Sequence, residues 1–292
     1  MRLRRVISFA AAAWFAVSCA AGRYASGPYD SEIKSIRSCD GTVEVVNYPS
    51  SEPALTEKRM VVYLPPDYYT DTLRNYPVLY LLHGARGNEV TWFERGDAFR
   101  KLDSLRRADQ AEDFILVLPN TNNYYNDKDY MYGRPLPAMR AFWLVSGETE
   151  RYFIHDVVDR VDSLYRTIDD RSARAIAGMS SGGLQALYLS ANSGLFDYVG
   201  LFSSYAKPTF AALGHGDVYG PLWPKLEEQF ADPPEKYSIY IGRNDFFLLH
   251  MKQFDRKLDR KGYEHDFTVS EGGHAWYNWR SYLTDFYKNV FK

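Results

Sequence analysis

The chain has 292 residues, of which 46% are hydrophobic and 25% charged, so it has the composition of a folded globular protein and not of a disordered one. Its formal net charge of −2 at pH 7 gives no reason to expect nucleic acid as a partner. The only two cysteines, Cys19 and Cys39, are too few for a disulfide framework or a cysteine-based metal site.

The N-terminus has the pattern of an export signal. Arginines at positions 2, 4 and 5 precede an apolar run, Val6–Val17, which is too short to span a bilayer. Small residues directly before Cys19 resemble the lipobox of bacterial lipoproteins, where the signal is cut before an acylated cysteine. We therefore expect a signal over residues 1–18, lipidation at Cys19, and an exported protein held to a membrane only by that anchor. An ordinary signal peptide and a secreted protein are the alternative.

Residues 19–41 lack periodicity and predict a tether, after which a succession of strands begins. The first two strands alternate and are predicted to be antiparallel, whereas the later ones are short apolar runs typical of strands buried on both faces. The predicted strands are Thr42–Tyr48, Lys58–Leu64, Val78–Leu82, Phe114–Leu118, Ala173–Ala177, Tyr198–Phe202, Tyr237–Ile241 and His265–Val269.

Helical patterns lie between the strands. The predicted helices are Ala98–Ala108, His155–Tyr165, Gly183–Ala191, Phe246–Lys261 and Trp279–Val290. Alternation of strands and helices favours a mostly parallel sheet with helices on both faces, an α/β fold in one domain over residues 42–292. The segment Asn120 to Thr149 is rich in Asn, Tyr, Gly and Pro, and its length predicts a functional loop.

One motif between a strand and a helix predicts a reactive serine. The segment Gly178-Met179-Ser180-Ser181-Gly182 has the glycine spacing of a nucleophile elbow, a tight turn that exposes Ser Oγ at the carboxyl edge of the sheet. The start of the following helix favours developing negative charge there. The spacing selects Ser180 over the adjacent Ser181.

A serine needs a base and an acid, which follow it along the chain in this type of site. Five of the six histidines are poor candidates for the base. Two precede Ser180, one lies before the best acid candidate, one lies inside a predicted helix, and one begins a predicted strand. His274 follows the last strand in a glycine-containing loop. Asp245 follows the strand Tyr237–Ile241 at the same sheet edge, and an N-cap role for Asp245 is the alternative.

The oxyanion of an acyl-transfer reaction needs two N–H donors. The residue after the nucleophile, Ser181, supplies one, and a loop after an early strand supplies the other. We expect the second donor to be the backbone N–H of Ala85, which follows His83-Gly84, although a neighbouring N–H could serve.

These motifs resemble those of the esterase family of the α/β-hydrolase superfamily that includes feruloyl esterases, acetyl-xylan esterases, S-formylglutathione hydrolases, enterochelin esterases and mycolyltransferases. The matching stretches are Val61–Pro66 with Asp67-Tyr68, Tyr76–Gly84, Trp92, Asp169-Asp170-Arg171, Gly178–Gly183 and Gly273-His274-Ala275-Trp276. The resemblance implies an α/β-hydrolase fold and a triad of Ser180, Asp245 and His274. It departs from many members at Ser181, where they have Met.

The resemblance and the export signal together imply a secreted serine carboxylesterase that removes feruloyl or acetyl groups from plant cell-wall polysaccharide such as xylan. No cofactor and no metal are expected. The candidates for binding the acylated polysaccharide are aromatic residues in loops, Trp92, Tyr124, Tyr125, Trp143 and Trp276. A siderophore esterase, an acyltransferase with the same triad, and a non-catalytic glycan-binding lipoprotein are the alternatives.

Overall fold

The computed structural model describes residues 39–53, 55–85, 87–121, 147–207 and 216–292. These residues form an eight-stranded sheet in the order β1-β2-β4-β3-β5-β6-β7-β8. Its strands are β1 (Thr42–Pro49), β2 (Glu57–Leu64), β3 (Val78–Leu82), β4 (Ile115–Pro119), β5 (Arg174–Met179), β6 (Tyr198–Phe202), β7 (Lys236–Gly242) and β8 (Asp266–Ser270). Strand β2 pairs antiparallel with β1 and β4, and all other pairs are parallel.

The strand β3 shows why the apolar runs form the middle of the sheet. All five of its residues are buried, and successive side chains point to opposite faces. Tyr80 and Leu82 belong to one hydrophobic core, whereas Leu79 and Leu81 belong to the other. A continuous apolar run thus supplies two cores at once, one on each face of the sheet.

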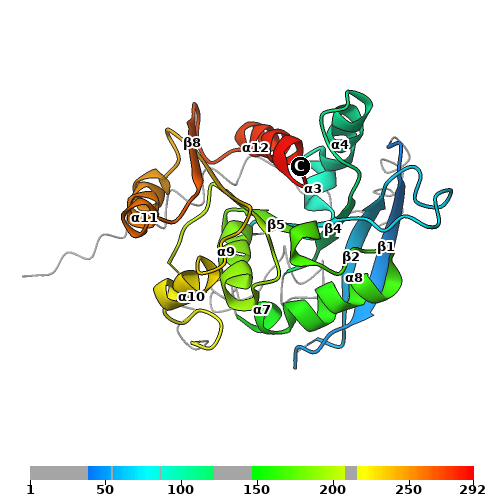
Figure 1. Cartoon of the computed structure of the whole chain (residues 1–292), viewed down its shortest axis with the longest axis horizontal. Coiled ribbons are helices and arrows are strands. Elements are labelled where there is room, and N and C mark those ends of the chain that lie inside the picture. The colour runs from blue at the N-terminus through cyan, green and yellow to red at the C-terminus, as the bar shows by residue number, and fades with distance from the viewer. Residues whose placement is uncertain (1–38, 54, 86, 122–146, 208–215) are drawn as a thin grey trace, which may run out of the picture.

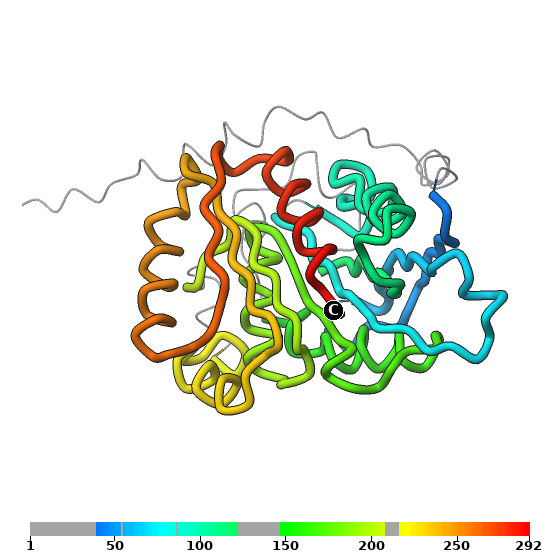
Figure 2. Tube along the Cα trace, turned by 45° about the horizontal axis from the view of Figure 1, so that its top comes forward, coloured from blue at the N-terminus to red at the C-terminus, as the bar shows by residue number. Residues whose placement is uncertain are grey.

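Helices cover both faces, as Figure 1 shows. One core is closed by α3 (Thr91–Glu94), α4 (Ala98–Arg107) and α12 (Trp276–Asn289). The other is closed by α7 (Glu148–Phe153), the π-helical turn Ile154–Val158, α8 (Asp159–Leu164), α9 (Ser181–Ser193), α10 (Leu222–Gln229) and α11 (Leu248–Lys261). A short 3₁₀ turn, Arg171–Ala173, precedes β5. The edge strands β1 and β8 lie at opposite sides of the molecule (Figure 2).

The predicted α/β-hydrolase fold is confirmed, and each predicted strand is observed within two residues of its expected ends. One helix begins earlier than expected. The predicted helix His155–Tyr165 is the second part of a longer helical segment that starts at Glu148, so the end of the expected loop Asn120 to Thr149 is helical. The helices α3 and α10 were not expected.

The expected signal, the anchor at Cys19 and most of the tether lie outside the described residues. No helix within the described ranges is long and apolar enough to cross a membrane.

Candidate active site

The turn at Ser180 joins the end of β5 to the start of α9. Ser180 has φ 56° and ψ −119°, a left-handed conformation that costs a non-glycine residue about 1–3 kcal/mol. Its N–H donates to the carbonyl oxygen of Phe202 at 2.8 Å, and its side chain is among the buried ones. The predicted elbow is therefore present, because the strained turn places Ser180 at the N-terminus of a helix.

The glycine at position 182 is required by a close approach. A Cβ atom on Gly182 would overlap the carbonyl oxygens of Leu82 and His83 at the end of β3. A Cβ on Gly84 would likewise lie 3.3 Å from the Cβ of Ser180. The end of β3 and the loop that follows it thus border the serine.

Ser180, His274 and Asp245 form one hydrogen-bonded line. The Nε2 of His274 lies 3.1 Å from Ser180 Oγ, and its Nδ1 lies 3.0 Å from Oδ2 of Asp245. Asp245 is 5% exposed, and its Oδ1 accepts the N–H of Phe247 at 2.9 Å. Because an ionised carboxylate only accepts, Nδ1 carries the imidazole proton and Nε2 offers a lone pair to the serine hydroxyl.

Hydrogen bonds also hold the loop that carries His274. The carbonyl of Gly273 accepts from the side-chain amide of Asn278 at 2.8 Å, and its N–H donates to the hydroxyl of Tyr277 at 3.0 Å. The rings of Phe246 and Trp279 lie 4.4 and 5.0 Å from the imidazole, centroid to centroid. These supports were not predicted. The buried Asn278, four residues after His274 in the first turn of α12, is the one that its spacing could have indicated.

One expected oxyanion donor, the N–H of Ser181, directly follows the serine, and the other, the N–H of Ala85, belongs to the peptide unit of Gly84, which lies close to Ser180. Ser181 is the first residue of α9, where a helix leaves backbone N–H groups without internal acceptors. Ala85 lies in a turn closed by a hydrogen bond of 2.9 Å from Gly87 N–H to the carbonyl of Gly84. Within the part of the chain that the structure describes, neither N–H has an acceptor, as a donor reserved for a ligand requires.

The expected role of Trp92 in contacting substrate is wrong in this structure. Its side chain is 1% exposed, and its indole N–H donates to the carbonyl of Leu82 at 2.9 Å. Its ring packs edge-to-face on Trp276 and Phe202. Trp92 is thus a core residue behind the site. Trp276 is only partly buried, whereas the candidates Tyr124, Tyr125 and Trp143 lie outside the described residues.

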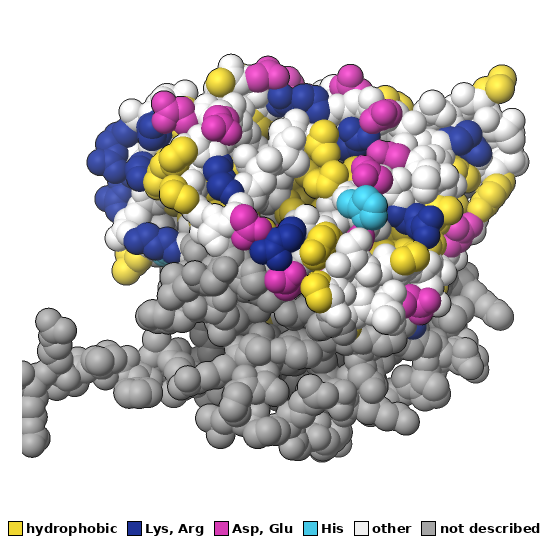
Figure 3. Space-filling view, turned by 90° about the horizontal axis from the view of Figure 1, so that it is seen from below, with side chains coloured by type: hydrophobic (Ala, Val, Ile, Leu, Met, Phe, Trp, Pro, Cys, Tyr) yellow, Lys and Arg dark blue, Asp and Glu magenta, His cyan; other side chains and the backbone are white. Residues whose placement is uncertain are grey.

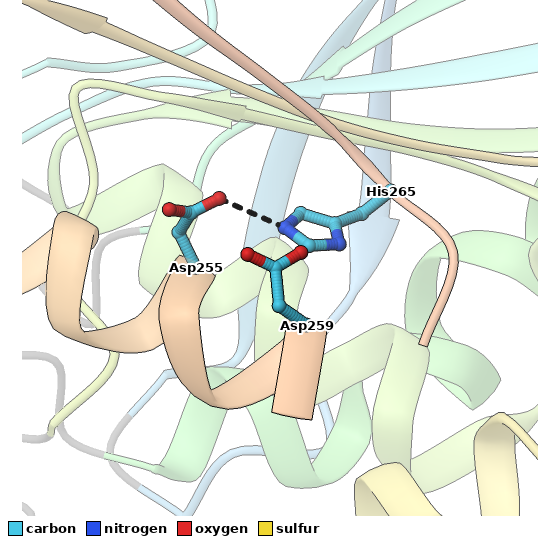
Figure 4. Close-up of side chains that lie close together, drawn as sticks. All are labelled: Asp255, Asp259 and His265. Carbon is cyan, nitrogen blue, oxygen red and sulfur yellow. Dashed lines mark hydrogen bonds and ion pairs between the residues drawn. The ribbon is translucent and has the colours of Figure 1, made fainter. Parts of the chain in front are cut away.

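One group of side chains in the described ranges has the atoms of a metal site. Asp255 and Asp259 on α11 point toward His265, which precedes β8, and their ligand atoms lie within 4.8 Å of one another (Figure 4). The imidazole is already held, because Nδ1 lies 2.8 Å from the carbonyl of Tyr263 and Nε2 lies 3.1 Å from Asp255. These contacts fasten the start of β8 to α11.

Acidic and basic side chains are interspersed over much of the described surface in Figure 3, with a group of Lys and Arg side chains at its left edge. This distribution agrees with the small net charge of the chain.

The chain is similar to known proteins in sequence and in fold. Residues 52–289 match the family model described as "Putative esterase". The chain is 28% identical over 237 residues to an endo-1,4-beta-xylanase/feruloyl esterase of Xylanibacter ruminicola, covering 79% of this chain and 29% of that protein. It is 24% identical to an acetyl esterase of Caldicellulosiruptor saccharolyticus, covering 72% of this chain and 82% of that protein.

The fold matches a solved ferulic acid esterase structure with a TM-score of 0.71 and 26% identity, covering 86% of this chain and 98% of that one. The chain spans between 29% and 56% of the length of the first four curated relatives. Since the family model covers most of the chain, from before β2 to the end of α12, the protein belongs to the esterase family and has its α/β-hydrolase fold.

Proposed function

We propose that the protein is a serine carboxylesterase with Ser180 as nucleophile, His274 as general base and Asp245 as the acid that orients the base. The observation that carries this proposal is the single hydrogen-bonded line from Asp245 through His274 to Ser180. Ser180 Oγ attacks the ester carbonyl while His274 Nε2 takes the hydroxyl proton. The same proton then goes to the leaving alcohol, and water attacks the acyl-enzyme with His274 again as base.

The tetrahedral intermediate carries negative charge on the former carbonyl oxygen. The N–H groups of Ser181 and Ala85 are the proposed donors to this oxygen, because Ser181 follows Ser180, Gly84 next to Ala85 lies close to Ser180, and neither N–H has an acceptor in the described part of the chain. The N-terminal end of α9 adds a favourable dipole. Ser181 acts through its backbone, so a serine there in place of the Met of many family members leaves this donor intact.

The proposed substrate is an acyl ester of plant cell-wall polysaccharide, with feruloyl or acetyl as the acyl group. Relatives named feruloyl esterase and acetyl esterase support both groups. The partly buried Trp276, two residues after His274, is the described aromatic candidate for contact with a sugar or phenolic ring. An acyltransferase with the same triad and a siderophore esterase are the alternative functions.

A substrate panel tests this proposal. Purified residues 42–292 would be assayed with methyl ferulate, acetylated xylan and enterobactin, and with methyl ferulate plus an acceptor sugar. Release of ferulate or acetate, with water as the acyl acceptor, is expected. Turnover of enterobactin alone would favour the siderophore esterase, and an acylated sugar as the main product would favour the acyltransferase. If no ester is turned over and the folded protein takes up no fluorophosphonate label, the esterase proposal is wrong.

We also propose export and lipidation at Cys19, on the basis of the basic residues and apolar run that precede it. Lipid on the N-terminal peptide, found by mass spectrometry of protein from membranes and lost in Cys19→Ser, is the expected result. A soluble mature protein that begins beyond Cys19 would contradict lipidation.

A further inference from the structure

A chain of buried polar groups connects the turn that carries Ala85 with the helix α7. The His83 ring donates from Nδ1 to the carbonyl of Gly84 at 2.8 Å, and its Nε2 accepts the backbone N–H of Thr121 at 3.0 Å and lies 3.2 Å from the Thr121 hydroxyl oxygen. The hydroxyl of Thr121 donates to Oε1 of Gln185 at 3.0 Å, and the amide of Gln185 donates to Oε1 of Glu150 at 2.6 Å. The four side chains that form this chain, from His83 to Glu150, are all buried.

The groups at the two ends set the direction of the hydrogen bonds next to them. A backbone carbonyl only accepts, so the Nδ1 of His83 must hold its proton and its Nε2 must accept. At the other end, Oε1 of Glu150 accepts from the side-chain amide nitrogen of Gln185, so the amide oxygen of Gln185 faces Thr121 and receives its hydroxyl. Burial lowers the pKa of His83 to about 4, which keeps the ring neutral and this pattern intact at neutral pH.

At the end of this chain of polar groups, His83 holds one peptide unit in place. The carbonyl of Gly84 and the N–H of Ala85 belong to the same peptide unit, which is planar and trans, so the two bonds point in opposite directions. The Gly84 oxygen accepts from both His83 Nδ1 and the N–H of Gly87. Holding this oxygen therefore fixes the direction of the Ala85 N–H. Gly87 must be glycine because a Cβ there would lie 2.9 Å from His83 Nδ1.

We propose that Thr121 and Gln185 are positioning residues that act through His83 to hold the Gly84–Ala85 peptide plane in the orientation that the oxyanion requires. Neither residue is proposed to touch the reacting atoms. Glu150 anchors the chain and also accepts the hydroxyl of Tyr219 at 2.7 Å, which ties the anchor to a second segment. This inference rests on the proposed esterase function, because it assigns a role toward the same oxyanion.

The test compares Thr121→Val and Gln185→Met, which remove polar atoms at nearly constant volume, with Thr121→Ser, which keeps the hydroxyl. Loss of one oxyanion donor costs about 10²–10³ in kcat, so displacing the donor should cost about tenfold. We expect kcat for an aryl ester to fall about tenfold in the first two variants, with KM within about twofold. Thr121→Ser should recover most of the loss. The double variant should be no worse than the more damaging single one, because both substitutions remove the same hydrogen bond between Thr121 and Gln185.

Two further readouts separate positioning from a general loss of structure. The inhibition constant of an arylboronic acid, a mimic of the tetrahedral intermediate, should rise in parallel with the fall in kcat. The kcat values would be normalised to folded protein by fluorophosphonate titration and urea denaturation. Thr284→Val on α12 is the matched control, since the half-buried Thr284 donates its hydroxyl to the carbonyl of Arg280 at 2.7 Å and does not belong to this chain of polar groups.

An active wild-type protein whose Thr121→Val and Gln185→Met variants keep wild-type kcat and boronate affinity would overturn this inference alone. Changes confined to KM, or no recovery in Thr121→Ser, would also overturn it. If Thr121→Val does not fold, Gln185→Met and Thr121→Ser decide the outcome by the same measurements. A folded wild-type protein inactive on all esters would instead overturn the proposed function, and this inference with it.

Discussion

The Nε2 atom of His274 lies 3.1 Å from the Oγ atom of Ser180, although 94 residues separate the two along the chain. Ser180 follows β5 and His274 follows β8, and both strands belong to the parallel part of the sheet. Parallel strands direct their carboxyl ends to one edge, so loops that follow them can meet there. The site is therefore a consequence of strand direction.

Replacing Asp245 by Asn should lower kcat for ester hydrolysis by about 10⁴-fold, because an amide can stabilise the wrong tautomer of His274 and cannot stabilise its charged form. Steady-state kinetics on an aryl ester gives the value. Asp255→Asn is a matched control, since Asp255 also contacts a histidine, His265, at 3.1 Å but lies outside the proposed triad. A loss in Asp245→Asn no larger than that in the control would argue against the orienting role.

Lys58 and Glu52 form a buried ion pair, with side chains 4% and 2% exposed, and Lys58 also donates to the hydroxyl of Thr149 at 2.9 Å. Lys58→Met leaves the carboxylate of Glu52 buried without its charge partner, which should lower the free energy of unfolding by about 3–5 kcal/mol. Urea denaturation measures the change. Arg100→Ala breaks an exposed pair with Asp97 and should cost less than about 1 kcal/mol. An equal loss in the free energy of unfolding for the two variants would contradict the expectation that the buried pair matters more than the exposed one.

The buried His83 predicts a loss of stability in acid. Burial lowers its pKa from 6.5 to about 4, and the positive charge of Lys58 acts in the same direction. Below about pH 6.5 the unfolded chain binds a proton at His83 that the folded protein does not bind. The contribution to stability is therefore complete above that pH and is lost as the pH falls toward 4, by up to about 1.4 kcal/mol per pH unit.

Urea denaturation of the wild type and His83→Asn between pH 7.5 and 4.5 tests this expectation. Other titrating groups are common to both proteins, so the difference in slope isolates His83. The variant should lose less stability than the wild type as the pH falls. Identical slopes would mean that His83 has a similar pKa in the folded and unfolded states.

Much of the fold could be predicted because its strands are contiguous apolar runs. In β3 and β6 every residue is buried, so the apolar run in the sequence and the strand in the structure begin and end at the same residues. The choice of Asp245 and His274 for the proposed triad came from strand order along the chain, which restricts which loops reach the edge at Ser180. The geometry of these loops agrees with the predicted residues Asp245 and His274.

The start of the helix at Glu148 could not be predicted, because its polar residues are buried. Thr149 and Glu150 read as loop or surface residues in the sequence, yet they bond to Lys58, Gln185 and Tyr219. These partners lie far away along the chain, and no local pattern indicates them. The prediction that Trp92 contacts substrate was wrong for the same reason. An indole ring suits a binding surface, but tertiary packing buries this one.

The nucleophile is tested most directly by Ser180→Ala, assayed for hydrolysis of p-nitrophenyl acetate and for labelling by a fluorophosphonate. We expect kcat to fall by at least about 10³-fold and labelling to disappear, with the free energy of unfolding preserved because strain at the turn is unchanged. Ser193→Ala, at the far end of α9, is the matched control and should keep both activities. Hydrolysis and labelling at the wild-type level in folded Ser180→Ala would contradict the assignment of Ser180 as the nucleophile.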